Sequence, residues 1–155
     1  MADDAANLFQ VLNEIAIVSQ LSTAVFEARL PEGVLVSHFS VLNHLTRVGD
    51  GATPLALARA FQVPKTTMTH TLSGLVARNW VDMRPNPDDG RSKRVWLTPE
   101  GRAFRNEAID RLAPDLARIS AALPGLADDV LPGLIKLRSW LDADRDAPVT
   151  GSLPR

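Results

Sequence analysis

The stretch NPDDGRSKR, residues 86–94, holds the side chains in this sequence that are best placed to do chemistry. Two carboxylates, a glycine and three cations share nine positions, and the prolines and Gly90 favour a projecting turn. Asp89 and Arg91 lie two positions apart, close enough for the carboxylate to orient the guanidinium. An exposed arginine on a thin ribbon can enter the minor groove of DNA, where negative potential is concentrated. The alternative is a turn that only increases solubility.

Catalytic and metal-binding residues are not expected elsewhere in the sequence. Of the three histidines, His38 and His44 lie six positions apart, so on one helix they face different directions and make a poor metal pair. The chain has no cysteine, which excludes disulfides, thiolate zinc sites and thiol redox chemistry. It has neither a serine in a nucleophile elbow nor a glycine-rich phosphate loop. We therefore expect no enzyme activity, no metal and no cofactor.

Alternating apolar residues on both sides of the charged stretch predict a two-stranded antiparallel hairpin. VDMR and RVWL both alternate, and the pairing residues are Val81 and Met83 on one side and Val95 and Leu97 on the other. Residues 85–93 then form the loop between the strands. The charges are expected to lie on that loop, away from the body of the protein.

A helix is predicted from Lys65 within KTTMTHTLSGLVARNW. Met68, Leu72 and Leu75 recur at i, i+4 and i+7, so they are expected to face inward. Asn79 stands where the helix should end and can adopt the left-handed conformation needed there. The side chains expected to point outward are Lys65, Thr66, Thr69, His70 and Ser73.

A shorter helix, TPLALARAF, precedes this one and completes a helix-turn-helix pattern. Thr53 suits the N-cap and Pro54 suits the first helical position, where its missing N–H costs nothing. The helix is expected to bury Leu55, Ala58 and Phe61. Only three or four residues separate the two helices, and the second has a polar face.

The polar face of the second helix is unusually rich in threonine. Four threonines between Thr66 and Thr71 each disfavour a helix by a few tenths of a kcal/mol relative to alanine. A purpose other than helix stability is therefore indicated, and hydroxyls that reach phosphates and base edges would supply one. The alternative is a helix that is merely polar.

The charge distribution supports a local phosphate-facing surface, although such segregation also arises by chance. Residues 51–105 carry nine basic and four acidic side chains, a balance of +5, within a chain of net charge −1. Aromatic residues make up 5% of a chain that is 45% hydrophobic, which favours packed helices over a sandwich or barrel. No apolar run approaches the roughly 18 residues of a membrane span, and the acidic start lacks a signal-peptide n-region. A soluble cytoplasmic protein is expected.

Residues 75–101, LVARNWVDMRPNPDDGRSKRVWLTPEG, resemble the winged-helix signature of the MarR family, the multiple antibiotic resistance regulators. LVSHFSVLNHL, residues 35–45, resembles the second helix of that family, and the resemblance covers nearly the whole chain. Two positions depart from the family pattern: Asn79 replaces the commoner glycine, and Pro64 stands where a serine or aspartate N-cap is common. The matching wing positions are Asp89, Arg91, Val95, Leu97, Thr98 and Gly101.

The family resemblance implies a mainly α fold with a small β-hairpin wing, a winged helix-turn-helix flanked by N- and C-terminal dimerisation helices. A single MarR-type domain would cover residues 1–155, with its DNA-binding lobe at 35–101. The dimerisation helices would lie at 5–30 and 102–144, and a flexible tail at 146–155. The resemblance also implies a cleft between the dimer helices and the winged lobe for a small aromatic or anionic effector, near His38 and His44. The alternative, which the sequence favours, is that these are buried or surface histidines without a ligand role.

The outer helices independently favour a homodimer, because they carry more apolar faces than one small winged domain can cover. Pro114 is expected to kink the helix that begins after the N-cap Thr98. The alternative is a monomer whose outer helices fold on its own lobe. The residues expected in the dimer interface are Leu8, Val11, Leu12, Ile15, Leu112, Leu116, Val130, Leu134, Leu137 and Leu141.

We therefore expect a dimeric, sequence-specific regulator of transcription, a repressor rather than an activator, whose operator is an inverted repeat in double-stranded DNA. The residues expected to contact DNA are Lys65, Thr66, Thr67, Thr69, His70 and Ser73 from the helix and Asp89, Arg91, Lys93 and Arg94 from the wing. In this expectation Asp89 orients Arg91, and Lys93 and Arg94 contact phosphates. The alternative is a winged-helix module that binds a protein rather than specific DNA.

Overall fold

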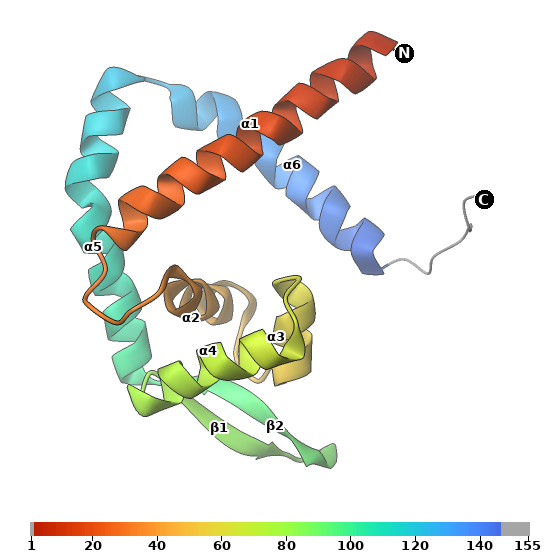
Figure 1. Ribbon diagram of the computed structural model, residues 1–155, viewed down its shortest axis with the longest axis vertical. Helices are drawn as coiled ribbons and strands as arrows, with labels where there is room; N and C mark the ends of the chain where they lie inside the picture. Colours follow the sequence, from red (N-terminus) through yellow and green to blue (C-terminus); the bar gives the residue numbers. More distant parts are fainter. Residues whose placement is uncertain (1, 147–155) are drawn as a thin grey trace. The chain divides into compact units, whose positions relative to one another are not determined.

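The computed structural model describes residues 2–146, which form six helices and one antiparallel hairpin (Figure 1). The expected mainly helical fold with a small hairpin is confirmed. The expected flexible tail, 146–155, lies outside the described residues except for Asp146, which ends the last helix. In chain order the elements are α1 (Ala2–Glu27), α2 (Val36–Val48), α3 (Pro54–Ala60), α4 (Lys65–Ala77), β1 (Val81–Asn86), β2 (Asp89–Leu97), α5 (Pro99–Ala122) and α6 (Leu126–Asp146).

The chain divides into two compact units, Met1–Leu112 and Ala113–Arg155. The first unit contains α1 to β2 and the beginning of α5, and the expected winged lobe at 35–101 lies wholly within it. The second unit contains the rest of α5 together with α6. Pro114 lies inside α5 and does not end it, while the expected kink stays a prediction.

The core of the first unit is built from the inner faces of α2, α3, α4 and the hairpin. Met68, Leu72 and Leu75 are buried on α4, as their spacing predicts. Burying each leucine side chain contributes about 1.5–3 kcal/mol. This apolar face fixes the rotation of α4 and so decides which of its side chains remain outside. The largest fully buried side chains are Val41, Leu42, Leu45, Leu57, Leu72, Leu75, Val81 and Val95.

The predicted rotation of α3 is wrong in part. Leu57 is fully buried, whereas Leu55 is 47% exposed. Ala58 is buried and Phe61 packs partly against the core, as expected. The helix has only seven residues, so several apolar spacings fit its sequence and its contacts with α4 decide the rotation. Thr53 caps it as predicted, its hydroxyl accepting a hydrogen bond from the N–H of Ala56 at 3.2 Å.

The hairpin is longer than the sequence predicts. The expected pairs Val81–Leu97 and Met83–Val95 are present, but the strands continue through the predicted loop, and only Pro87 and Asp88 form the turn. The pairing tolerates Pro85 because its register shifts between Pro85 and Asn86, and such irregularities accommodate a residue that cannot donate to the ladder. The charged residues therefore lie on a hairpin whose first strand packs against α4 (Figure 1).

A short bridge before α3 supports the hairpin from its other edge. Ala52 pairs with Val95, and the backbone N–H of Leu97 donates to the Asp50 carboxylate at 2.8 Å. This pairing is not predictable from the sequence, because a single bridging residue has no alternating pattern. It ties β2 to the segment that leads into the helix-turn-helix.

The turn from α4 into β1 and the start of α5 are locked together. Asn79 adopts φ 56°, the left-handed conformation predicted for it. The Thr98 hydroxyl donates to the Asn79 carbonyl at 2.7 Å and accepts from the N–H of Gly101 at 3.0 Å, which confirms Thr98 as the N-cap of α5. Gly101 packs so closely on Trp80 that an added Cβ would lie 2.8 Å from the Trp80 carbonyl carbon.

Most apolar residues of α1 remain exposed in the single chain. Phe26 joins the core, where its ring meets Phe39 edge-on at 4.4 Å, but Phe9 and Leu21 are 69% and 65% exposed. Among the described residues, α1 over Asp3–Glu27 is long and apolar enough to cross a membrane, with mean hydropathy 1.3. This corrects the expectation that no segment approaches a span. A helix covered by another protein surface has the same composition, so the finding is weak evidence for a membrane.

Candidate nucleic-acid interface

The outer face of α4 presents a continuous polar surface. All of the residues expected to contact DNA from this helix are exposed, namely Lys65, Thr66, Thr67, Thr69, His70 and Ser73. Thr71 differs from its neighbouring threonines because it is buried, and its hydroxyl donates to the Thr67 carbonyl at 3.2 Å. Only three of the four threonines are therefore available to a ligand.

Two hydroxyls on this face are already bonded to their own helix. Thr69 donates to the Lys65 carbonyl and Ser73 to the Thr69 carbonyl, each at 2.9 Å. A hydroxyl has one donor and two acceptor lone pairs, so both groups still accept hydrogen bonds from a ligand. Donating to a ligand would require the hydroxyl to leave its helical carbonyl.

The C-terminal end of α4 is anchored by Arg78. Its guanidinium donates to the Gly74 carbonyl at 3.1 Å and to the Gly33 carbonyl at 2.6 Å, and it lies over the Trp80 ring at 5.6 Å. Trp80 in turn stacks on Phe104 of α5, with 3.8 Å between ring centroids. The role of Arg78 is not predictable from the sequence, because contact with a loop 45 positions away leaves no local signal.

The predicted contact between Asp89 and the Arg91 guanidinium is not the one that the structure shows. The Asp89 carboxylate accepts from the backbone N–H of Arg91 at 3.0 Å. Such a bond shapes the backbone at the wing tip, as aspartates commonly do two residues before a donor. The Arg91 side chain is exposed, as is Lys93, so both cations are presented to solvent.

Asn86, which is not among the predicted site residues, organises the wing from within. Its amide is buried and donates to the Ser92 hydroxyl at 2.8 Å, while its oxygen accepts from the Asp88 N–H at 3.1 Å. The same oxygen accepts from Nε of Arg94 at 2.9 Å, and Arg94 also pairs with Asp88. Arg94, expected as a phosphate contact, is therefore half-buried and engaged within the wing. An Asn-Pro pair at a turn was the available signal.

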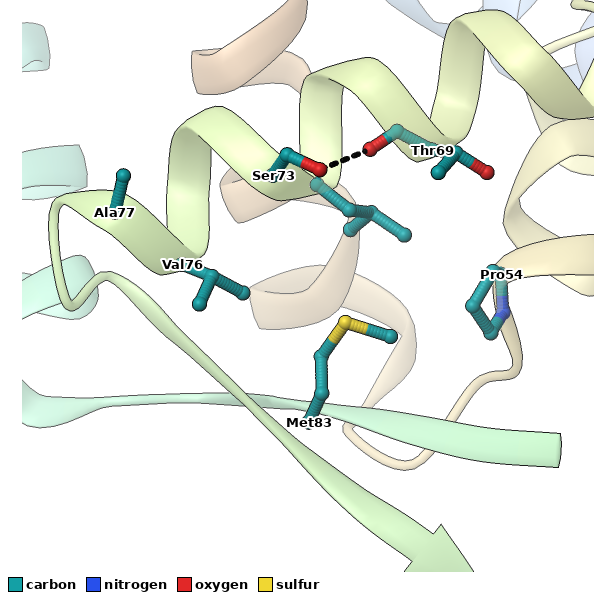
Figure 2. A pocket seen from close by; sticks show the side chains of 7 residues that line it. Pro54, Thr69, Ser73, Val76, Ala77 and Met83 are labelled. Atoms are coloured by element: carbon teal, nitrogen blue, oxygen red, sulfur yellow. Dashed lines mark hydrogen bonds between the residues drawn. The ribbon is translucent and has the colours of Figure 1, made fainter.

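A concavity of about 340 Å³ lies between α4, β1 and the start of α3 (Figure 2). Figure 2 shows Met83 reaching toward α4, with Thr69 and Ser73 on the opposite wall. The lining is apolar apart from these two hydroxyls, a combination that suits an apolar ligand held by few polar contacts. The lining residues are Pro54, Thr69, Leu72, Ser73, Val76, Ala77 and Met83.

The two histidines expected near an effector cleft are engaged within the fold. His38 is 5% exposed, and its Nδ1 accepts a hydrogen bond from the N–H of Leu35 at 3.1 Å. The ring of His44 lies 5.2 Å from the ring of Phe61. Neither lines the concavity at α4, and the expected effector cleft near them stays a prediction. Within residues 2–146 no group of three or more His, Asp or Glu side chains could hold a metal ion.

A polar recognition helix beside a cationic hairpin, with a short helix packed behind it, defines a winged helix-turn-helix protein. The MarR family model matches residues 32–92, which include all of α2 to β1. The multiple antibiotic resistance protein MarR of Salmonella typhimurium is 31% identical over 86 residues, which are 56% of this chain and 59% of that protein. The chain thus spans less than two thirds of the length of the curated relatives it matches.

Solved structures extend the likeness beyond the winged lobe. The transcriptional regulator BldR from Sulfolobus solfataricus superimposes with a TM-score of 0.72 at 25% identity, over 84% of this chain and 94% of that one. A mutant MarR from E. coli, crystallised with operator DNA, gives a TM-score of 0.65 at 26% identity, over 84% and 94%. The chain is similar to MarR family proteins over its winged lobe and to solved transcriptional regulators over most of its length. BldR is a transcriptional regulator, and this likeness agrees with the expectation of no enzyme activity.

Proposed function

We propose that this protein is a homodimeric regulator of transcription that binds an inverted-repeat operator and represses until a small molecule releases it. The observation that carries the proposal is the exposed polar face of α4 beside a wing that presents Arg91 and Lys93. A recognition helix of this kind enters the major groove, and its hydroxyls and imidazole reach base edges. The E. coli relative crystallised with operator DNA supports the same use of the fold.

The two halves of the interface have different tasks. In the proposed complex Thr66, Thr67, Thr69, His70 and Ser73 lie near base edges, and Lys65 lies near phosphate. Arg91 enters the minor groove, Lys93 contacts phosphate, and Asp89 acts through the backbone of Arg91. The main role proposed for Arg94 is to hold the shape of the wing through its contacts with Asn86 and Asp88, and not to contact phosphate.

The exposed apolar faces of the outer helices support the homodimer. On α1 the exposed residues include Leu8, Val11 and Leu12, and a groove of about 530 Å³ lies between the α5 and α6 residues of the second unit. Leu112 is an exception, because it packs against the core of its own chain. Apolar surface of this extent is rare on soluble monomers and marks an interface. The remaining interface residues proposed are Ile15, Leu116, Val130, Leu134, Leu137 and Leu141.

The concavity beside α4 supports release by an effector. A flat aromatic molecule there would contact Thr69 and Ser73, which the proposed complex needs at the DNA. Its binding and DNA binding would then exclude one another. An anionic group on the effector would be favoured by the local excess of positive charge. A cytoplasmic location follows from a regulator that must reach the chromosome.

Selection of binding sites from random duplexes with the purified protein tests the function. We expect an inverted repeat with half-site centres about 34–36 Å apart, one helical turn. His70→Ala should change the selected sequence, with a loss of about 1–3 kcal/mol if one good base contact disappears. Lys65→Ala should weaken all sequences similarly and lower the salt slope by about one. A monomer that selects no sequence would favour the alternative, a winged-helix module that binds protein.

The wing is tested by two substitutions in the same dimer. Arg91→Ala should leave the fold intact, because exposed side chains change stability by about 0.5 kcal/mol or less, yet weaken operators with A·T-rich flanks most. Asp89→Ala should also weaken binding, because the backbone N–H of Arg91 loses its acceptor. Charge alone predicts the opposite effect on affinity, because the substitution removes a carboxylate that faces phosphates and so should tighten binding. Tighter binding by Asp89→Ala at matched salt would therefore reduce the wing to bulk positive charge.

A further inference from the structure

His38 is a buried titratable side chain that lies outside the proposed DNA-contacting set. It occupies the third position of α2, and its Nδ1 accepts from the N–H of Leu35, the N-cap residue, at 3.1 Å. This is the return bond of a capping box, in which the side chain at this position satisfies the free donor at the start of a helix. Accepting at Nδ1 requires that nitrogen to be unprotonated, so the ring is neutral and its proton is on Nε2.

The other side of the His38 ring lies against the recognition helix. Gly74 stands in the middle of α4, and a Cβ built there would lie 2.5 Å from Nε2 of His38 and 3.2 Å from Cε1. No side chain larger than a hydrogen fits between ring and helix without a shift. Glycine in a helix interior lowers helix stability by roughly 1 kcal/mol relative to alanine. The close approach of the His38 ring explains why position 74 is nevertheless glycine. His38 thus connects the start of α2 directly to the backbone of α4.

The surroundings of His38 oppose a positive charge. Burial lowers its pKa from the ordinary value of 6.5, and the charges of Arg78 and His70, both near the ring from the α4 side, lower it further. Arg78 is held in place by the Gly74 and Gly33 carbonyls, so its charge cannot move far from the ring. A protonated ring would also carry a second N–H pointing at the N–H of Leu35, and neither could accept.

We propose that His38 is a positioning residue for the recognition helix, and that protonation of its ring displaces α4 and weakens DNA binding in mildly acidic solution. The proposal rests on the proposed DNA-binding function. Protonation removes the cap of α2 and places charge against Gly74 at once, so the ring must leave its site or α2 and α4 must separate. Either response moves the polar face of α4 relative to the wing.

The pH window follows from the direction of the shift. Because the folded protein holds the pKa of His38 below its unfolded value, the unfolded chain takes up the proton first as the pH falls. The stability associated with the neutral ring is complete above about pH 6.5. It is lost progressively as the pH drops from there through the folded pKa. Exposed histidines on a DNA-facing surface act with the opposite sign, because their protonation adds charge that attracts phosphate.

His38→Gln separates capping from titration. A glutamine at this position accepts the same N–H in a capping box and carries no titratable group. Operator affinity of the wild-type protein should fall more steeply than that of His38→Gln between pH 7.5 and 5.5, because only the wild-type side chain takes up a proton there. His44→Gln, on the same helix, is the matched control and should behave as the wild type does. Equal pH profiles for wild type and His38→Gln would overturn the proposal.

A measurement without DNA distinguishes failure of this inference from failure of the proposed function. Nitrogen-15 spectra of the free protein should show His38 as the Nε2–H tautomer with a depressed pKa. The amides of Gly74 and Arg78 should shift with the same titration, and these shifts should be lost in His38→Gln. If α4 amides follow His38 while the protein binds no DNA, the coupling stands and the proposed function fails. If they do not follow it, the inference is wrong whatever the DNA result.

Discussion

Replacing Gly101 with alanine tests whether the close packing of α5 on the end of α4 holds the lobe together. An added Cβ would lie 2.8 Å from the Trp80 carbonyl carbon and 3.0 Å from Cδ1 of Leu97, and closer still to the Trp80 carbonyl oxygen. Carbon atoms normally approach to about 3.5 Å. The Trp80 atoms belong to the backbone, so they cannot rotate away, and the start of α5 must move instead.

The magnitude follows from what that movement breaks. The Thr98 N–H donates to the Trp80 carbonyl at 3.1 Å, and the Thr98 hydroxyl donates to the Asn79 carbonyl at 2.7 Å. Overpacking costs about 1–3 kcal/mol, each lost hydrogen bond costs about 0.5–1.5 kcal/mol, and alanine returns about 1 kcal/mol of helix propensity. The free energy of unfolding should fall by about 3 kcal/mol, which lowers Tm by about 6–12 °C in a chain of this length.

Urea unfolding followed by far-ultraviolet circular dichroism measures the effect, at one fixed protein concentration because dimerisation adds to stability. Gly133→Ala in α6 is the matched control, since nothing lies within 4 Å of a Cβ built there. That variant should gain up to about 1 kcal/mol. If Gly101→Ala is within about 0.5 kcal/mol of the wild type, the contact between Trp80 and α5 does not constrain the lobe and the reasoning fails.

Three further substitutions test the core, the end of α4 and the wing. Leu72→Ala should lower the free energy of unfolding by about 2–5 kcal/mol, whereas Leu55→Ala should change it by less than about 1 kcal/mol, because Leu55 is exposed. Similar losses for the two variants in urea titrations would contradict the rotation of α3. Asn79→Ala should cost about 1–2 kcal/mol and Asn79→Gly should cost nothing, because φ is 56°; equal stabilities would show that the left-handed turn is not required. Asn86→Ala should lose about 1–3 kcal/mol and weaken operator binding in a shift assay as much as Arg91→Ala does; unchanged affinity would mean that the wing holds its shape without the buried amide.

Periodicity alone could predict the elements and the outer face of α4. Met68, Leu72 and Leu75 repeat over two turns, so only one rotation of the helix buries all three, and the exposed set follows. The seven residues of α3 do not repeat often enough for this, so the sequence predicts that Leu55 is buried, whereas the buried residue is Leu57. The hairpin register was predictable because residues 81–84 and 94–97 alternate. Its length was not, because prolines and charges within residues 85–93 indicate a loop by composition.

The roles of individual polar residues depended on contacts that the sequence does not display. The spacing of Asp89 and Arg91 fits a bond to the guanidinium as well as a bond to the backbone N–H, and the fold selects the second. The sequence predicts that Arg94 is an exposed cation, whereas in the structure its guanidinium contacts Asn86 and Asp88. Arg78 and Gly33 are 45 positions apart, and Gly74 and His38 meet only because α2 and α4 pack together.

The sequence by itself determined the order of helices and hairpin, the inward face of α4, the caps at Thr53 and Thr98 and the left-handed turn at Asn79. Each depends on neighbours within a few positions, where backbone geometry and side-chain periodicity are local properties. Only the tertiary structure decided which histidine is buried, which cation braces the wing and why residue 101 is glycine. Those outcomes depend on atoms brought together from distant positions. In a close-packed interior the position of each side chain is set by its spatial neighbours, which the local sequence does not identify.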